Sequence, residues 1–223
     1  MKSSDKSASS STASLRSLLP EPAIQRLPWY LAYVSQLRAL GVEQVSSTQI
    51  SKHLNVDASQ IAKDLSYLNV RGKTRIGYDV EKLEAALADF LCFQKTHRAV
   101  ILGVGSLGAA LIGDVGLGRY GLKIVAGFDV EEKLPIGDIP VFNISEVDRR
   151  VRELGAEVGI LTVPHDVAQE VADMATQAGI KAIWNFSPHR LQPRPGVVIQ
   201  DTSLYSHLAL MYNRLEQQAA TNV

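Results

Sequence analysis

The stretch RAVILGVGSLGAAL, residues 98–111, constrains the fold more than any other part of the chain. An apolar run leads directly into Gly103, Gly105 and Gly108, and the apolar positions that follow have helical spacing. A buried strand that enters a glycine turn and then a helix typically opens a parallel sheet with helical crossovers. The sequence therefore predicts an α/β domain in the C-terminal half of the chain.

The segments after this stretch alternate between apolar and amphipathic runs, as a parallel sheet requires. Helices are expected from Ser106, Ser145 and Asp166, with strands at LKIVAGFD, EVGILTVP and IKAIWNF between or after them. The SEVD at 145–148 resembles a capping box, which supports the second of these helices.

The three glycines fit a dinucleotide site because each meets a separate requirement. Gly103 permits a tight turn, Gly105 lets the backbone approach a pyrophosphate at the helix N-terminus, and Gly108 allows close packing of helix on strand. Asp129 ends the next apolar run, where it would accept hydrogen bonds from ribose hydroxyls. The alternative is that the glycines only pack a helix against a strand.

The acid at Asp129 also predicts which nucleotide is bound. A carboxylate repels a 2′-phosphate, and the following FDVEEKL offers no arginine to neutralise one, so NAD(H) is favoured over NADP(H). Two further strand ends, TVP and NFSP, fall at the same edge of the sheet and are candidates for the nicotinamide half, although simple packing of strand ends would explain them too. The predicted cofactor-binding residues are Gly103, Val104, Gly105, Ser106, Leu107, Gly108, Asp129, Thr162, Val163, Asn185 and Phe186.

The sequence offers no set of catalytic groups to accompany this site. His53, His97, His165, His189 and His207 have no obvious carboxylate partner in sequence, and no serine sits in a GxSxG elbow. No spacing of His, Cys or Asp suggests a metal site. We therefore expect a protein that binds a dinucleotide and does not use it in a reaction.

The N-terminal half reads as a helix-turn-helix preceded by one longer helix. LPWYLAYVSQLRALG, residues 27–41, predicts that first helix, which Gly41 would end. Two short helices follow in SSTQISKHLNVDASQIAKDLSYL, with Ser47 expected to cap the first and Asp57 the second. The apolar face expected for the first helix consists of Trp29, Tyr30, Tyr33, Val34, Leu37 and Leu40.

The second short helix is expected to expose groups suited to base edges and phosphates. NVRGKTRIGYDV follows it, and the basic residues there, including Arg71, suit a two-stranded wing on a DNA backbone. The alternative is an ordinary helical adaptor whose charges form a solvated face. The predicted DNA-binding residues are Ser59, Gln60, Lys63, Ser66, Tyr67, Lys73 and Arg75.

Composition limits the remaining possibilities. Lys plus Arg (23) balance Asp plus Glu (23), so any nucleic-acid binding must come from a local patch. No window approaches the roughly 20 apolar residues of a membrane span, and no secretory segment opens the chain, so a cytoplasmic location is expected.

Residues 1–18 are serine-rich and predict a disordered tail. The single cysteine, Cys92, excludes a disulfide within the chain and is expected to be buried or half-buried.

Over roughly residues 19–216, these motifs together resemble the Rex family of redox-sensing transcriptional repressors. The resemblance implies a homodimer that binds an inverted-repeat DNA operator when NADH is low and releases it when NADH accumulates, so that genes of fermentative or respiratory metabolism are repressed according to the NADH/NAD⁺ ratio. It also implies that the last helix is swapped onto the partner subunit. That helix carries an apolar stripe that must be buried somewhere, with packing on its own subunit as the alternative: Leu204, Leu208, Met211 and Leu215, flanked by Tyr205 and Tyr212.

Three positions depart from the family pattern. Ala62 stands where the recognition helix usually carries a basic residue, Asp114 lies near a usual tyrosine, and Thr202 near a usual aspartate, with Asp201 one residue away. In the family the last two help couple the nicotinamide state to the angle between domains. These departures therefore concern two properties: the DNA sequence that the recognition helix prefers, and the coupling between the nicotinamide state and DNA binding.

The expected architecture is an α/β chain with four parts. Residues 1–18 form the tail, 19–95 a winged helix-turn-helix domain, 96–202 a Rossmann-type parallel-sheet domain that binds NAD(H), and 203–223 a domain-swapped C-terminal helix. Two other functions stay open at this point: an NAD-dependent oxidoreductase with an accessory N-terminal helical module, and a nucleotide-binding adaptor that contacts protein rather than DNA.

Overall fold

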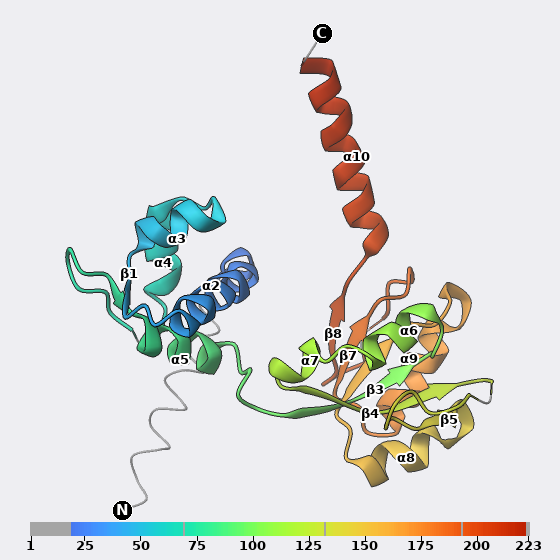
Figure 1. The fold of residues 1–223 in the computed structure, drawn as a ribbon. Helices are drawn as coiled ribbons and strands as arrows, with labels where there is room; N and C mark the ends of the chain where they lie inside the picture. The colour runs from blue at the N-terminus through green and yellow to red at the C-terminus, as the bar shows by residue number, and fades with distance from the viewer. Residues whose placement is uncertain (1–18, 69, 132, 193, 222–223) are drawn as a thin grey trace, which may run out of the picture. The chain divides into compact units, whose positions relative to one another are not determined.

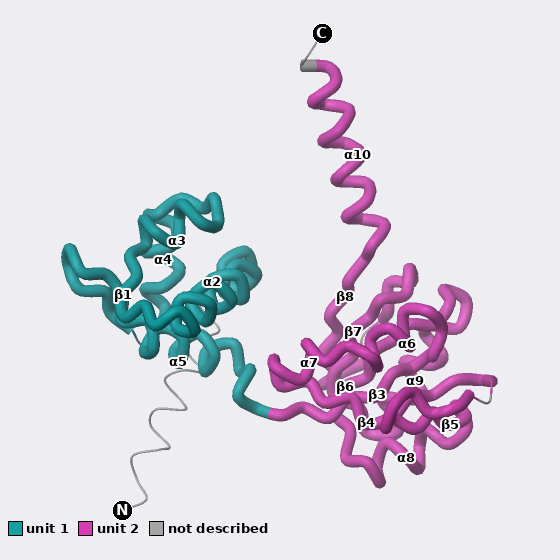
Figure 2. The backbone as a smooth tube through the Cα atoms, in the orientation of Figure 1, with its two compact units in different colours: residues 1–95 teal, residues 96–223 magenta. Residues whose placement is uncertain are grey.

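The chain divides into two compact units, Met1–Lys95 and Thr96–Val223, in the computed structural model of the protein (Figure 2). The structure describes residues 19–221 apart from 69, 132 and 193, so the tail predicted at 1–18 lies outside the described residues. Each unit has a hydrophobic core of its own.

The N-terminal unit contains the helix-turn-helix that the sequence predicts. A long helix precedes it. Two antiparallel strands of two residues each pair the segment just before the helix-turn-helix with the segment that follows it. Its elements are α2 (Glu21–Ala39), β1 (Gln44–Val45), α3 (Ser47–Leu54), α4 (Ala58–Leu65), β2 (Tyr78–Asp79) and α5 (Val80–Phe90). Helices α2 and α5 pack together and, with Ile50 from α3 and Ile61 and Leu65 from α4, enclose the core.

Two local expectations for this unit were wrong. Ser46, not Ser47, caps α3: its hydroxyl accepts from Gln49 N–H at 3.1 Å, and the Gln49 side chain accepts from Ser46 N–H at 2.8 Å. On α2, Trp29 is 59% exposed and Leu40 71% exposed. Trp29 lies off the stripe of residues 23, 27, 30, 31 and 34 that a helix turning 100° per residue directs inward, and Leu40 comes after the helix ends.

A buried carboxylate ties the second short helix to the first long one. Asp64 on α4 accepts two hydrogen bonds from Arg26, at 2.8 and 2.9 Å, and one each from Tyr30 and Gln60 at 2.8 Å. Burial opposes ionisation of Asp64, but these donors and the Arg26 charge outweigh it and hold the pKa of Asp64 below its usual value. Burial and the Asp64 hydrogen bond raise the pKa of Tyr30 to about 12. At neutral pH, Asp64 is therefore a paired anion that orients α4.

The C-terminal unit is a doubly wound α/β domain. In its described part, six parallel strands lie in the order β5-β4-β3-β6-β7-β8. The strands are β3 (His97–Leu102), β4 (Leu122–Asp129), β5 (Val141–Asn143), β6 (Val158–Leu161), β7 (Ala182–Asn185) and β8 (Val198–Asp201). The helical elements are α6 (Ser106–Ile112), α7 (Gly116–Arg119), the 3₁₀ turn η1 (Ile144–Glu146), α8 (Val147–Leu154), the 3₁₀ turn η2 (His165–Val167), α9 (Ala168–Gln177) and α10 (Leu204–Thr221).

Helices cover both faces of the sheet (Figure 1). Alternate residues of the strands build a separate core on each face. On β3, Val100 and Leu102 pack with α8 and α9, whereas Ala99 and Ile101 pack on the side of α6. The chain leaves β3 toward β4 and β5 in one direction, and returns to β6, β7 and β8 in the other. The carboxyl ends of β3 and β6 therefore flank the topological switch point, where ligands of such sheets bind.

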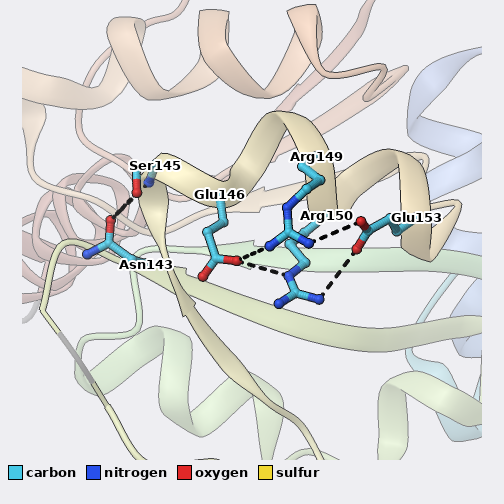
Figure 3. A network of polar contacts seen from close by, with 6 residues as sticks. All are labelled: Asn143, Ser145, Glu146, Arg149, Arg150 and Glu153. Carbon is cyan, nitrogen blue, oxygen red and sulfur yellow. Dashed lines mark hydrogen bonds and ion pairs between the residues drawn. The ribbon is translucent and has the colours of Figure 1, made fainter.

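The expected SEVD capping box does not form. Asn143 instead accepts from the N–H and hydroxyl of Ser145, at 3.0 and 2.8 Å, and so caps η1, and α8 begins only at Val147. Glu146 pairs with Arg149 and Arg150, and both arginines also contact Glu153 (Figure 3). Arg150 in addition lies 4.2 Å above the ring of Phe142, so the network covers the edge strand β5.

The last helix, α10, exposes large apolar side chains to solvent. Its residues 204–220 are exposed, so in this chain it does not bury its stripe against its own unit. No helix among the described residues is long and apolar enough to span a membrane.

Replacing Asp64 tests how far the N-terminal unit depends on its buried ion pair. We expect Asp64→Asn to lower the free energy of unfolding by about 3 kcal/mol, because Arg26 and the buried Tyr30 hydroxyl lose their charged acceptor. Glu43→Gln, which removes an exposed carboxylate of the same unit, is the control. Urea denaturation would measure both, and equal effects would contradict a stabilising role for Asp64.

The same pair predicts an acid-sensitive contribution to stability. Because the folded-state pKa of Asp64 is lowered, its contribution is present above the unfolded-state value of about 3.9 and is lost as the pH falls through the folded-state value. The stability difference between wild type and Asp64→Asn should therefore be constant from pH 7 to 5 and shrink below about pH 4. A difference that stayed unchanged down to pH 2 would argue against ionised Asp64 as its source.

Candidate nucleotide cleft and nucleic-acid interface

A cleft of about 910 Å³ opens at the carboxyl end of the sheet. Residues that follow β3 and β6 form its walls, and the end of β4 closes one side. Several predicted residues line it: Gly103, Gly105, Leu107, Asp129, Thr162, Val163 and Phe186. The cleft thus stands at the topological switch point of the sheet.

The glycine loop is shaped by close contacts. Gly103 has a φ of +95°, and a Cβ there would lie 2.7 Å from a methyl of Val163. A Cβ on Gly108 would lie 2.2 Å from the Gly103 carbonyl oxygen. No side chain therefore fits at Gly103 or Gly108, although Gly103 also lines the cleft. A Cβ on Gly105, which lines the cleft as well, would meet nothing within 4 Å. The loop is therefore closely packed at Gly103 and Gly108 and leaves open space at Gly105.

The remaining loop residues take different positions. The Val104 side chain is buried against the sheet, so only its backbone lies at the loop surface. Ser106 is exposed at the start of α6 but is not among the residues that line the cleft. The Thr162 hydroxyl donates to the Gly103 carbonyl at 2.6 Å, which joins the loop to the end of β6.

Asp129 is held at the end of β4 by the glycine loop and by its own turn. Its Oδ2 accepts from Val104 N–H at 2.7 Å, and its Oδ1 accepts from Glu131 N–H at 3.1 Å. Burial opposes ionisation, but these hydrogen bonds and the nearby Lys133 keep the pKa of Asp129 below its usual value. The carboxylate is therefore ionised at neutral pH and pre-oriented in the cleft wall.

Lys133 is a member of this site that the sequence reasoning missed. Its Nζ donates to the Val104 carbonyl at 2.6 Å and lies 3.1 Å from Asp129 Oδ2. The prediction of the nucleotide rests on the absence of a neighbouring arginine and takes no account of lysine. A lysine four residues after the acid was the available signal.

Asn185, predicted for the nicotinamide half, has hydrogen-bond partners within the protein. It is buried, donates to the His189 carbonyl at 2.8 Å and to Asp201 at 2.7 Å, and accepts from Ser187 N–H at 3.0 Å. It is also not among the residues that line the cleft, so it holds together the turn after β7. Unexpectedly, Leu204 from the first turn of α10 contributes to the cleft wall, as does Tyr205.

The positions that depart from the family pattern have local partners. The Asp114 carboxylate accepts from Gly116 N–H in an exposed turn after α6. Thr202 accepts a hydrogen bond from the Trp184 indole N–H at 2.8 Å, just before α10 begins. Cys92 is half-buried and follows the end of α5 with a φ of +61°.

Two histidines, each next in sequence to residues that line the cleft, are in ring contact. The rings of His165 and His189 lie 4.7 Å apart, edge to face, next to the cleft-lining Pro164 and Pro188. Within the described ranges, no group of three His, Cys, Asp or Glu side chains is arranged to hold a metal ion.

Helix α4 presents part of the surface expected of it. Ser59, Lys63 and Ser66 are exposed, as is Ala62. Two residues expected on this surface are instead half-buried: Gln60, whose side chain donates to Asp64, and Tyr67, which packs against the core.

The segment after α4 forms a small hairpin with a basic tip. Lys73 N–H donates to the Gly77 carbonyl at 2.7 Å, and Gly77 N–H donates back at 2.8 Å. Arg75 sits in the turn between them with a φ of +67°, and Arg71, Lys73 and Arg75 are all exposed. Since Asp64 is buried and paired, the exposed charges in the described part of 63–75 are all positive.

Comparisons with known proteins follow this division of the chain. A family model described as Putative DNA-binding protein N-terminus matches residues 19–66, and one described as CoA binding domain matches residues 94–189. The redox-sensing transcriptional repressor Rex of Bacteroides fragilis is 52% identical over 200 residues, which are 88% of this chain and 91% of that protein. The Rex of Porphyromonas gingivalis is 50% identical over 214 residues, 95% of this chain and 98% of that protein.

Solved structures of a Rex-family repressor, RSP, match the fold. RSP in complex with β-NAD⁺ and operator DNA superposes with a TM-score of 0.84 at 32% identity, covering 92% of this chain and 95% of that one. RSP in complex with β-NADH gives a TM-score of 0.80. The predicted union of an N-terminal DNA-binding domain with a parallel α/β domain is confirmed, as is the prediction of a regulator rather than an enzyme. The chain belongs to the Rex family of redox-sensing transcriptional repressors.

Proposed function

We propose that this chain is a repressor that binds operator DNA through α4 and the 73–77 hairpin, and releases it when NADH occupies the cleft of the C-terminal unit. The observation that carries the proposal is that one chain holds both a segment, 63–75, whose exposed charges in its described part are all positive, and a cleft with a glycine loop and an oriented carboxylate. The RSP structures, one with NAD⁺ and operator DNA and one with NADH, support the same pairing of ligands.

In the cleft, the loop backbone at Gly103 and Gly105 would face the pyrophosphate, where Gly105 leaves open space. Among the described residues, Asp129 Oδ1 accepts a single hydrogen bond, so it can accept another from a ribose hydroxyl. Thr162, Val163 and Phe186 are assigned to the nicotinamide half. Asn185 is left out of this assignment because its amide is bound within the protein.

The family model that matches residues 94–189 is named for coenzyme A, which is a second nucleotide to compare with NAD(H). Coenzyme A carries a phosphate on the 3′-hydroxyl of its ribose, next to the position that Asp129 would contact. The partly buried, ionised Asp129 carboxylate can only accept hydrogen bonds, so it suits a free ribose hydroxyl, which donates, better than a phosphate, which does not. Asp129 therefore favours NAD(H), in which both ribose hydroxyls are free.

On DNA, the exposed Ser59, Lys63 and Ser66 would contact the groove and its phosphates, while Lys73 and Arg75 would contact the backbone from the hairpin. Gln60 is held by Asp64 and is assigned to orientation of the helix more than to base contacts. Tyr67 retains a half-exposed ring at the end of α4. A cytoplasmic location follows from access to chromosomal DNA and the nucleotide pool.

The exposed apolar side chains of α10 support a homodimer in which this helix is exchanged. An apolar stripe of this length left in water marks an interaction surface. A dimer would also match an inverted-repeat operator, with half-sites about 34 Å apart per helical turn of DNA. The exposed apolar residues of the helix are Leu204, Tyr205, Leu208, Leu210, Met211, Tyr212 and Leu215.

The cleft and α10 share residues, which gives the switch a physical route. Leu204 and Tyr205 line the cleft at the start of the helix, so a nucleotide bound there contacts the segment that leads into the dimer surface. NADH can shift the dimer only by as much as it prefers the state with lower DNA affinity. Differential contact at this end of the cleft is where that preference would arise.

Loss of the Asp129 charge should weaken nucleotide binding selectively. We expect Asp129→Asn to raise the Kd for NADH by about 10- to 100-fold, because a hydrogen bond to a charged group contributes roughly 1.5–3 kcal/mol. Calorimetric titration would measure the Kd, with Asp138→Asn, an exposed acid of the same unit, as control. DNA binding without nucleotide should not change. An unaltered Kd for NADH would remove Asp129 from the ribose site.

Removing a cation from α4 should weaken DNA binding in a salt-dependent way. We expect Lys63→Ala to reduce operator affinity and to lower the slope of log K against log salt by about 1, because one phosphate contact is lost. Lys123→Ala removes the same charge from β4 and is the control. If both variants kept the wild-type slope, the DNA contact would lie elsewhere on the chain.

A further inference from the structure

Lys133 stands out among the charged residues of the cleft. The charged side chains that line it, within the described residues, are Asp129, Glu131, Asp166, Glu170 and Lys133, so Lys133 is the single cation among them. It is partly buried, with 29% of its side chain exposed. Nothing in the motif that defines the ribose site requires a lysine here.

The contacts of Lys133 connect the two halves of the ribose site. Its Nζ donates to the Val104 carbonyl in the glycine loop at 2.6 Å and lies 3.1 Å from Asp129 Oδ2. Asp129 Oδ2 also accepts from Val104 N–H, so the carboxylate, the loop residue and the ammonium form one closed set of contacts. An ammonium has three N–H donors. The described contacts use two of them, and Lys133 is among the residues that line the cleft.

The pairing changes how the site should treat a phosphate. A lone carboxylate at the end of β4 repels a 2′-phosphate and so selects NAD(H). Here the ammonium lies 3.1 Å from the carboxylate, so its attraction for a nearby phosphate offsets part of the repulsion that the carboxylate exerts. The remaining donor of the ammonium could also bind a phosphate oxygen.

We propose that Lys133 is a specificity-determining residue, which sets how strongly the ribose site prefers a free 2′-hydroxyl over a 2′-phosphate. This inference rests on the proposed NADH site. With Lys133 present, rejection of the 2′-phosphate is partial. Without it, the uncompensated Asp129 carboxylate rejects the phosphate more strongly.

The test compares NADH with NADPH, which share one fluorophore and differ only at the 2′ position. The Kd of each is measured by fluorescence titration on the full-length protein for wild type and Lys133→Met. We expect the ratio of Kd for NADPH to Kd for NADH to rise about tenfold in Lys133→Met, because one charge near the phosphate is removed. Lys133→Arg, which keeps the charge, should stay within about twofold of the wild-type ratio.

Further variants separate charge from folding. Lys123→Met removes a lysine at the opposite end of β4 and should keep the wild-type ratio. Lys133→Gln keeps a donor for the Val104 carbonyl but lacks the charge, so it should show the same raised ratio even if Lys133→Met fails to fold. Asp129→Asn frees the ammonium and should lower the ratio below that of wild type.

The outcomes are distinct. If the neutral variants raised both Kd values equally, the ratio would not change and Lys133 would only support the loop, which overturns the inference while the NADH site stands. A wild-type protein that bound neither nucleotide would overturn the proposed function, and this inference with it.

Discussion

The hydrogen bond from Val104 N–H to the Asp129 carboxylate is the contact on which the rest of the nucleotide site depends. It joins the glycine loop after β3 to the last residue of β4, and those strands are neighbours in the sheet. The loop can make this contact because Gly103 takes a φ of +95° and Gly108 lets the helix pack under it. Backbone conformation, strand register and the charge of the site are thus set together.

The N-terminal unit is organised around a second buried carboxylate. Asp64 faces inward from α4 and is bound by residues of α2, so the outward face of α4 is left to its polar and basic residues. The same arrangement removes the one acid of 63–75 from the surface, so the exposed charges in the described part of that segment are all positive. Asp64 therefore both stabilises the N-terminal unit and keeps a negative charge off the surface of this segment.

Most of the fold and of the candidate site could be predicted from short sequence patterns. The glycine loop, Asp129 at a strand end and the helix-turn-helix are each written within a short segment, and family membership follows from their union. Details that depend on packing were missed: Trp29 belongs to an apolar segment but points outward, and Asn185 is a polar strand end whose amide is used inside the protein.

Contacts between distant segments could not be predicted in the same way. Arg26 and Asp64 lie 38 positions apart, and nothing in either segment signals the partner. Likewise, no pattern places the first turn of α10 at the cleft, because a pattern of apolar spacing says that a face must be buried and not where. Lys133 was within reach, since it lies only four residues after Asp129.

Release of DNA on binding of reduced nucleotide is the property that distinguishes a redox-sensing repressor from other DNA-binding proteins. The decisive measurement is the fluorescence anisotropy of a labelled operator fragment bound to the protein at fixed salt, titrated separately with NADH and NAD⁺. We expect the anisotropy to fall with NADH at concentrations where NAD⁺ has little effect. Firm DNA binding that responds to neither nucleotide would rule out a redox-sensing repressor.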